Sequence, residues 1–210
     1  MSLVPDTSLI SAFSVPGTHD STAISSTSTV GCQMMDITTQ LNSGIRFINM
    51  WCGLVKNVLF MFHNFYPINP PDFLPFASVV SSIETWLGSY SSEAVIVQIR
   101  QDNYPIASTI SFATAVSNLI SKSASFWIIG DTIPTLQTVR GKIQLVRRYP
   151  VNNAAGEASI GIDLIPRDPA ENKIGVKKKR MTKTSAAKKR DWPVAARSIG
   201  LLFSRHGQAT

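Results

Sequence analysis

The 210-residue sequence is poor in cysteine and in charge, and it has no long apolar run. Its two cysteines, Cys32 and Cys52, fit no CxxC zinc-binding pair, and we expect both to be inert core thiols. The longest apolar run, Val58–Phe62, is far shorter than the ~20 residues that span a bilayer. Residues 1–6 lack the basic start and the apolar core of a signal peptide. Neither export nor membrane insertion is therefore expected, and a cytoplasmic or peripheral-membrane location fits best.

Several nucleotide-binding and hydrolase motifs are missing too. The sequence has no Walker loop, no GxGxxG after a predicted strand and no GxSxG nucleophile elbow. It also has no internal repeat of the length that builds solenoids or propellers. These absences argue against P-loop enzymes, Rossmann-type dehydrogenases and α/β-hydrolases.

The net charge of +7 is confined to one end of the chain. Residues 1–166 hold 8 Lys and Arg against 10 Asp and Glu, whereas residues 167–210 hold 12 against 3. Two basic runs, Lys177–Arg180 and Lys188–Arg190, dominate the second part, and such runs repel themselves and stay solvated. We therefore predict one near-neutral domain over residues 1–166 and a basic tail with little regular structure over residues 167–210.

The predicted domain alternates short β-branched or aromatic runs with segments of helical period, which is typical of βα units around a mostly parallel sheet. Its apolar face predicts a helix over Phe76–Leu87 that Gly88 would end. Further helices are expected over Gln33–Leu41 and over Phe112–Ile120, after Ser108 as a candidate N-cap. The expected strands are Ile10–Val15, Arg46–Trp51, Val58–His63, Ala94–Arg100, Lys142–Arg148 and Ile160–Leu164.

Two histidines follow predicted strands. His19 and Asp20 come just after the first strand, and His63 ends the strand that begins at Val58. In a βα barrel the carboxyl ends of the strands form the catalytic face. Two imidazoles that titrate near neutrality can act there as base and acid for a proton-transfer reaction. We favour this interpretation over that of ordinary strand-end histidines bonded to the backbone.

Five strings, in unbroken order over about residues 8–166, resemble the X domain of phosphatidylinositol-specific phospholipases C. The likeness is to the metal-independent bacterial enzymes and their fungal relatives. It implies a distorted TIM-type (β/α) barrel, which is incomplete here because about 166 residues fall short of the ~250 of a full barrel. The strings are SVPGTHDS (Ser14–Ser21), QLNSGIRF (Gln40–Phe47), FH (Phe62–His63), SEAVIV (Ser92–Val97) and RGKIQL (Arg140–Leu145).

The resemblance implies a phosphoric diester hydrolase that cleaves inositol phospholipids through attack of the inositol 2-hydroxyl on phosphorus. His19 would be the general base, His63 the general acid that protonates the departing diacylglycerol oxygen, and Asp20 a support for that proton transfer. An internal nucleophile supplies proximity, so paired proton transfer and stabilisation of phosphoryl charge are the main demands on the protein. No cofactor is expected.

The sequence departs from the family pattern at three positions. Asn49 and Trp51 stand where the metal-independent enzymes carry an aspartate and a phosphate-contacting arginine, and Asn64 follows His63 where glycine is usual. With Asn49, Trp51 and Asp20 at the positions where the calcium-dependent relatives carry their ligands, a calcium site of that type is not supported, and no metal is expected. Loss of a preorganised charge costs on the order of 10²–10³ in rate. A catalytically impaired protein that binds phospholipid headgroups therefore remains the alternative.

Four further charged residues at strand ends are candidates for holding the inositol ring or the phosphate. They are Arg100 and Asp102 after one strand and Arg147 and Arg148 after another. Arginine suits phosphate because its planar fork donates two parallel hydrogen bonds. For each of them a solvated charge at a strand end is an equally good reading.

The basic tail has three interpretations. It fits a polybasic attachment to anionic lipid at a peripheral membrane surface, at ~1 kcal/mol per basic residue. It also fits a bipartite nuclear-localisation signal or a nucleic-acid-binding arm, which would make this a nuclear protein. The third is a misjoined reading frame that has replaced the last barrel strands.

Overall fold

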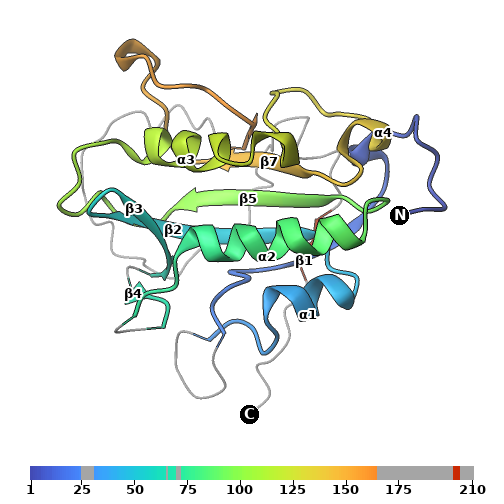
Figure 1. Cartoon of the computed structure of the whole chain (residues 1–210), viewed down its shortest axis with the longest axis horizontal. Coiled ribbons are helices and arrows are strands. Elements are labelled where there is room, and N and C mark those ends of the chain that lie inside the picture. Colours follow the sequence, from blue (N-terminus) through green and yellow to red (C-terminus); the bar gives the residue numbers. More distant parts are fainter. Residues whose placement is uncertain (25–30, 65, 70–71, 165–200, 204–210) are drawn as a thin grey trace, which may run out of the picture.

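The computed structural model describes residues 1–24, 31–64, 66–69, 72–164 and 201–203, and it is built on one mixed sheet (Figure 1). Five strands, β9, β1, β2, β5 and β7, run parallel in this order, and the short strands β6 and β8 both pair with β7. Strands β3 and β4 add antiparallel ribbons beside β2. The strands are β1 Val15–Thr18, β2 Phe47–Val55, β3 Val58–His63, β4 Tyr66–Pro67, β5 Val95–Gln101, β6 Trp127–Ile128, β7 Ile143–Arg148, β8 Ile162–Asp163 and β9 Leu201–Phe203.

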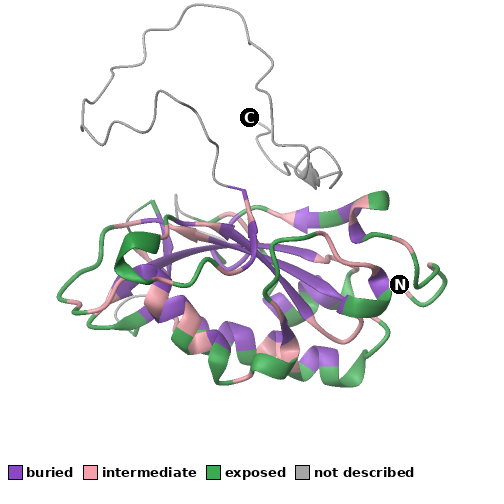
Figure 2. Cartoon of the chain, turned by 90° about the horizontal axis from the view of Figure 1, so that it is seen from above, coloured by how far each residue is buried: buried purple, intermediate pink, exposed green. Residues whose placement is uncertain are grey.

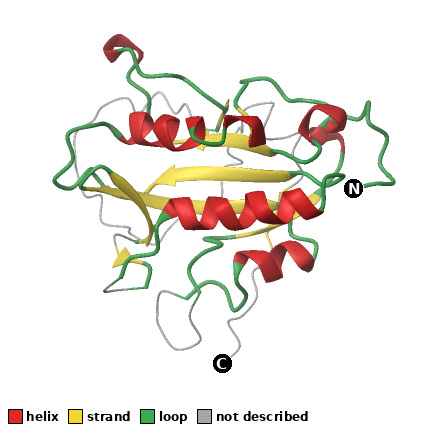
Figure 3. Ribbon diagram, viewed as in Figure 1, coloured by secondary structure: helices red, strands yellow, loops and turns green. Residues whose placement is uncertain are grey.

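Helices α1, α2 and α3 lie along one face of this sheet (Figures 2 and 3), whereas α4 packs Leu136 and Val139 into the core on the other face. The helices are α1 Ile37–Asn42, α2 Phe76–Ser89, α3 Phe112–Ser121 and α4 Leu136–Val139, with 3₁₀ turns at Ile10–Ala12, Ala124–Phe126 and Asn153–Ala155. The buried sides of α2 and α3 turn toward the strands, and their exposed sides form the outer surface. Within the described ranges the sheet does not close on itself. Among these residues no helix has the length and apolar character needed to cross a bilayer.

The two faces of the sheet differ because successive side chains of a strand point in opposite directions. Ile48 and Val97 pack with the helices in the larger core cluster, whereas Phe47 and Ile96 belong to a smaller cluster on the other face. Asn49, two residues after Phe47, therefore lies on the face opposite helices α1, α2 and α3, in register with Gln98 of β5. Buried polar side chains thus collect on the face that carries Asn49 and Gln98, toward the carboxyl ends of the strands.

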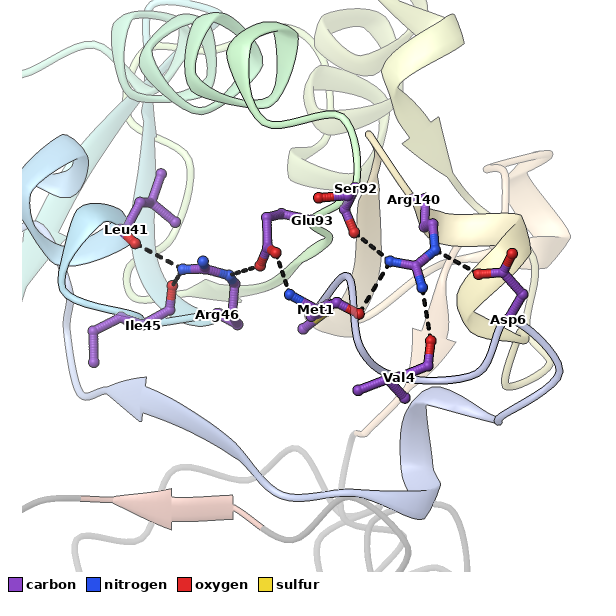
Figure 4. A network of polar contacts seen from close by, with 9 residues as sticks. All are labelled: Met1, Val4, Asp6, Leu41, Ile45, Arg46, Ser92, Glu93 and Arg140. Atoms are coloured by element: carbon purple, nitrogen blue, oxygen red, sulfur yellow. Dashed lines mark hydrogen bonds and ion pairs between the residues drawn. The ribbon is translucent and has the colours of Figure 1, made fainter.

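A network of charges ties together the amino-terminal edge of the sheet (Figure 4). Arg46 Nε donates to Glu93 Oε2 at 2.8 Å, and the amino group of Met1 also pairs with Glu93. Burial by itself would raise the pKa of Glu93, but hydrogen bonds from the Met1 amino group and from Arg46 outweigh it and hold that pKa below its usual value. Arg140 Nε donates to Asp6 Oδ1 at 2.6 Å. Charges at this edge of a βα sheet serve stability.

The predicted strand Ile10–Val15 is wrong. Residues 10–12 form a 3₁₀ turn, in which the Ile10 amide donates to the Pro134 carbonyl, and β1 begins only at Val15. A short run of apolar residues does not distinguish a strand from a turn that packs its side chains into the core. The shift brings the end of β1 directly before His19. The other five predicted strands are confirmed, with ends that differ by up to four residues.

The three predicted helices are also confirmed, but not their end signals. Helix α2 runs through Gly88 to Ser89, and the N-cap of α3 is Ser111, whose side chain accepts from the Thr114 amide. Ser108 instead donates to the Ile106 carbonyl. Strand β9 lies in the segment that we expected to lack structure; the rest of that segment, residues 167–200 and 204–210, falls outside the described residues.

Candidate active site

His19 and Asp20 lie in the loop that leaves the carboxyl end of β1. His19 is exposed, and its carbonyl accepts a hydrogen bond from Gln33 Nε2 at 2.6 Å. Asp20 is fully buried and adopts a positive φ of 42°, which turns the chain away from the strand direction. Its amide donates to Asn49 Oδ1 at 2.9 Å. The loop conformation is therefore held from the neighbouring strand β2.

His63 lies at the same edge of the sheet as His19, but on a strand that runs in the direction opposite to the one expected. It does not end a parallel strand equivalent to β1, because β3 runs antiparallel to β2 and pairs Met61 with Cys52. Strand β2 extends beyond its parallel neighbours, and the β2–β3 hairpin returns the chain at His63 to the edge where the parallel strands end. Its Nε2 lies 3.8 Å from Asp20 Oδ2. The fold thus brings together the three residues predicted to be catalytic.

Trp51 lies against both histidines. Its indole ring meets the His19 imidazole edge-on, with ring centroids 5.3 Å apart, and meets the His63 imidazole edge-on at 5.7 Å. The indole Nε1 donates to Asn49 Oδ1 at 2.9 Å, which fixes the orientation of the ring. Trp51, which replaces the family arginine, therefore packs against both imidazoles.

Asn49 is the centre of a buried hydrogen-bond network. Its Oδ1 accepts from the Asp20 amide and from Trp51 Nε1, and its Nδ2 donates to Gln98 Oε1 at 2.6 Å. Its own amide donates to Ser21 Oγ at 2.9 Å. All the polar atoms of the side chain are used, as buried amides require. At this position Asn49 connects the loop after β1 to β2 and β5.

Two of the predicted substrate-binding residues, Arg100 and Asp102, also face the site. The Arg100 guanidinium stacks 3.8 Å from the centre of the Trp51 ring, with which it is in register across β2 and β5. Asp102 is buried and lies close enough to influence Asp20 electrostatically. Burial raises the pKa of Asp20 to about 8, Asp102 adds to the rise, and Arg100 opposes it. The Asp20 carboxyl therefore titrates near neutrality.

The other two predicted substrate-binding residues separate, because consecutive residues of β7 point to opposite faces. Arg147 is buried and forms an ion pair with Asp163 Oδ2 at 2.9 Å, and it also donates to the Tyr149 carbonyl. The structure does not bring it to the histidines. Arg148 is half-buried and lies in register with Arg100, on the face that carries the site.

Cys32 is the site residue that the sequence did not reveal. It is half-buried rather than a core thiol, and its Sγ lies 3.9 Å from His63 Nε2. Burial and the charge of Asp20 raise the pKa of the thiol. Cys52, by contrast, is fully buried as predicted. No motif could have assigned Cys32 to the site, because the loop that carries it returns to His63 only in three dimensions.

The chain is similar to known proteins both in sequence and in structure. A family model described as PI-PLC X matches residues 8–141. The chain is 29% identical over 161 residues to the 1-phosphatidylinositol phosphodiesterase of Listeria monocytogenes, which covers 70% of this chain and 47% of that protein. It therefore spans about half the length of this curated relative.

Solved structures agree on the fold. The phosphatidylinositol-specific phospholipase C of Listeria monocytogenes superposes with a TM-score of 0.60 at 25% identity, over 80% of this chain and 63% of that one. A Staphylococcus aureus enzyme of the same name gives a TM-score of 0.65 at 21% identity, over 77% and 57%. The predicted fold class, an incomplete TIM-type barrel, is confirmed. The match of the family model over more than half of the sequence establishes that this chain belongs to the PI-PLC X domain family.

Proposed function

We propose that this chain is a phosphoric diester hydrolase that cleaves inositol phospholipids by acid-base catalysis with two histidines. The observation that carries the proposal is the convergence of His19, His63 and Asp20 at one edge of the sheet. Both imidazoles contact the same Trp51 ring, and His63 Nε2 is 3.8 Å from the Asp20 carboxyl. A substrate phosphate that bridges the two imidazoles would have a base on one side and an acid on the other.

The proposed reaction needs no group beyond those of the chain and the substrate. His19 accepts the proton of the inositol 2-hydroxyl while that oxygen forms a bond to phosphorus. The bond between phosphorus and the diacylglycerol oxygen breaks, and His63 donates the proton that this oxygen requires. The products are a cyclic inositol phosphate and diacylglycerol. The Asp20 carboxyl, with its pKa raised by burial to about 8, can exchange a proton with His63 near neutral pH.

Arg100 is the residue that we propose for phosphate charge. The family arginine is replaced by Trp51, and the Arg100 guanidinium lies over the face of that indole. Stacking on an aromatic ring holds a guanidinium in place while its N–H groups remain directed outward. We infer that Arg100 on the neighbouring strand β5 supplies the positive charge that the family arginine would supply on β2, and that the Trp51 ring supports the Arg100 guanidinium. Asp102 and Arg148 are proposed to contact the inositol ring.

The histidine assignments are tested by release of inositol phosphate from phosphatidylinositol vesicles. We expect His19→Ala and His63→Ala each to lower kcat by about 10²–10⁴, the usual contribution of a general acid or base. His206→Ala is the matched control, because it removes the third histidine of the chain, outside the matched region. It should keep wild-type turnover. Equal turnover in all four proteins would reject acid-base catalysis by these residues.

A second candidate function is binding of the headgroup without turnover. The observation in its favour is that Trp51 occupies the position of the family arginine and contacts both imidazoles. This candidate predicts that wild-type protein binds phosphatidylinositol vesicles and releases no inositol phosphate. The assay above separates the two functions, since only the first gives a rate that depends on His19 and His63.

A further inference from the structure

We propose that Asp20, Cys32 and His63 form a binding site for a zinc-type transition-metal ion, and that an ion bound there blocks proton donation by His63. The site itself is independent of the proposed function, whereas the inhibitory effect rests on it. The three side chains place one oxygen, one sulfur and one nitrogen within 4.8 Å of one another. No other group of three such side chains is this close among the residues whose positions are described.

The distances between these atoms fit a tetrahedral ion. Cys32 Sγ lies 3.9 Å from His63 Nε2, and that nitrogen lies 3.8 Å from Asp20 Oδ2. Bonds of about 2.0 Å to nitrogen and oxygen and about 2.3 Å to sulfur give tetrahedral ligand-to-ligand distances of roughly 3.3–3.6 Å. These two spacings therefore need a contraction of a few tenths of an ångström. The third, between Cys32 Sγ and the Asp20 carboxylate, is at most 4.8 Å, so an ion would draw these two side chains together by up to about 1.3 Å.

Asp20 gives a second, independent indication of a ligand. Its side chain is fully buried, and neither carboxylate oxygen has a hydrogen-bond partner among the described residues. A buried carboxyl without donors is costly, and buried charges are normally paired or bound to a metal. A cation between Asp20, Cys32 and His63 would satisfy this group.

The backbone holds the three ligands in position from three directions. The Cys32 amide donates to the Ala23 carbonyl at 2.8 Å, which closes the loop back onto the segment after β1. The Asp20 amide is fixed on Asn49, and His63 ends the β2–β3 hairpin. Cys32 is half-buried, so an ion can enter from its side. The site is thus built mostly before the ion arrives.

The donor set selects the class of metal. One thiolate, one imidazole and one carboxylate suit zinc and similar borderline-soft ions, whereas magnesium and calcium prefer oxygen ligands alone. Three protein ligands leave a fourth position open, for water or for a phosphate oxygen. The metal deprotonates a thiol that coordinates it, so the raised pKa of Cys32 does not prevent binding.

Occupancy of this site would change the proposed reaction. The His63 nitrogen that faces Asp20 and Cys32 is Nε2. An imidazole bonded to zinc through Nε2 cannot take up the second proton that makes it an imidazolium, and the ion also interrupts the proton exchange proposed between His63 and Asp20. Zinc should therefore inhibit hydrolysis by competing for the general acid.

The binding test uses the full chain without lipid, so that it does not depend on activity. Zinc is titrated against a chromophoric chelator in the presence of wild type, Cys32→Ala, Cys32→Ser or Cys52→Ala. We expect wild type and Cys52→Ala to withdraw zinc from the chelator with the same affinity, and both Cys32 variants to bind at least about tenfold more weakly. Cobalt should give a thiolate charge-transfer band with wild type and Cys52→Ala only.

Circular dichroism of each variant checks that the fold is retained. Equal zinc affinity in wild type and in both Cys32 variants, or no withdrawal of zinc by wild type, would overturn the site. The inhibitory effect is tested separately, as the ratio of turnover with chelator to turnover with zinc. We expect a large ratio for wild type and a ratio near one for Cys32→Ala. Activation by zinc, or equal inhibition of both proteins, would overturn that effect.

Discussion

At the scale of single residues, the site depends on an amide where the family carries a carboxylate. Asn49 is 3% exposed, and it both accepts and donates within the network of Asp20, Trp51 and Gln98. A carboxylate could accept from the first two partners but has no N–H for the Gln98 carbonyl. The substitution at position 49 is thus matched to its neighbours, and it orients Trp51 as well as the loop of His19.

Replacement of Asn49 by leucine should lower both stability and turnover. The change keeps the side-chain volume but leaves the Asp20 amide, Trp51 Nε1 and Gln98 Oε1 without partners. We expect the free energy of unfolding to fall by about 1–3 kcal/mol. Urea denaturation measures this loss. As a control, Asn118→Leu on the exposed side of α3 should change it by less than about 0.5 kcal/mol; equal effects of the two substitutions would contradict the network's role.

At the scale of elements, the close approach of β1 to β2 positions His19. Gly17 lies opposite Phe47 in the register of these strands, and a Cβ at position 17 would come within 2.9 Å of Phe47 Cβ and 3.1 Å of the Phe47 carbonyl oxygen. Neither atom is the end of a flexible side chain. Only glycine allows this spacing, two residues before the proposed general base.

Gly17→Ala should therefore push β1 away from β2. We expect a loss of about 1–3 kcal/mol in the free energy of unfolding, as for overpacked sites, together with a drop in kcat from displacement of His19. Gly88→Ala is the matched control, because a Cβ in that part of α2 meets nothing within 4 Å. Alanine there should stabilise the protein by about 0.5–1 kcal/mol. Thermal unfolding and vesicle hydrolysis measure both variants, and unchanged activity in Gly17→Ala would contradict this account of β1.

At the scale of the whole molecule, the two ends of the sheet have different surfaces. The amino-terminal edge carries the charge network of Glu93 and Arg140 (Figure 4). Around the site, the loops after β1 and β5 expose large apolar side chains, with Met34 86% and Tyr104 77% exposed. Exposed apolar groups around the proposed headgroup site would suit contact with a membrane surface. We therefore expect the edge of the sheet that carries the site to face the membrane.

Removal of this apolar rim, defined as Met34 and Tyr104, should weaken binding to vesicles. For the double variant Met34→Ser/Tyr104→Ser we expect a loss of affinity for phosphatidylinositol vesicles of about tenfold, equivalent to ~1.4 kcal/mol. Sedimentation with vesicles measures it. Leu3→Ser is the control, since Leu3 is 98% exposed but lies near the opposite edge. Equal affinity in the double variant and wild type would show that the membrane contacts another surface.

Local sequence patterns determined the order of the main elements and identified the residues that we propose to be catalytic. Apolar periodicity located five strands and three helices, and the strings around His19, Asp20 and His63 indicated the site, because these signals lie within a few consecutive residues. The tertiary structure decided what depends on contacts between distant segments. The β2–β3 hairpin returns His63 to Asp20, Trp51 turns between the imidazoles, Arg147 faces away and Cys32 approaches His63. A local hydrophobic pattern cannot predict these contacts, because they form only when distant strands pair and the loop after β1 folds back.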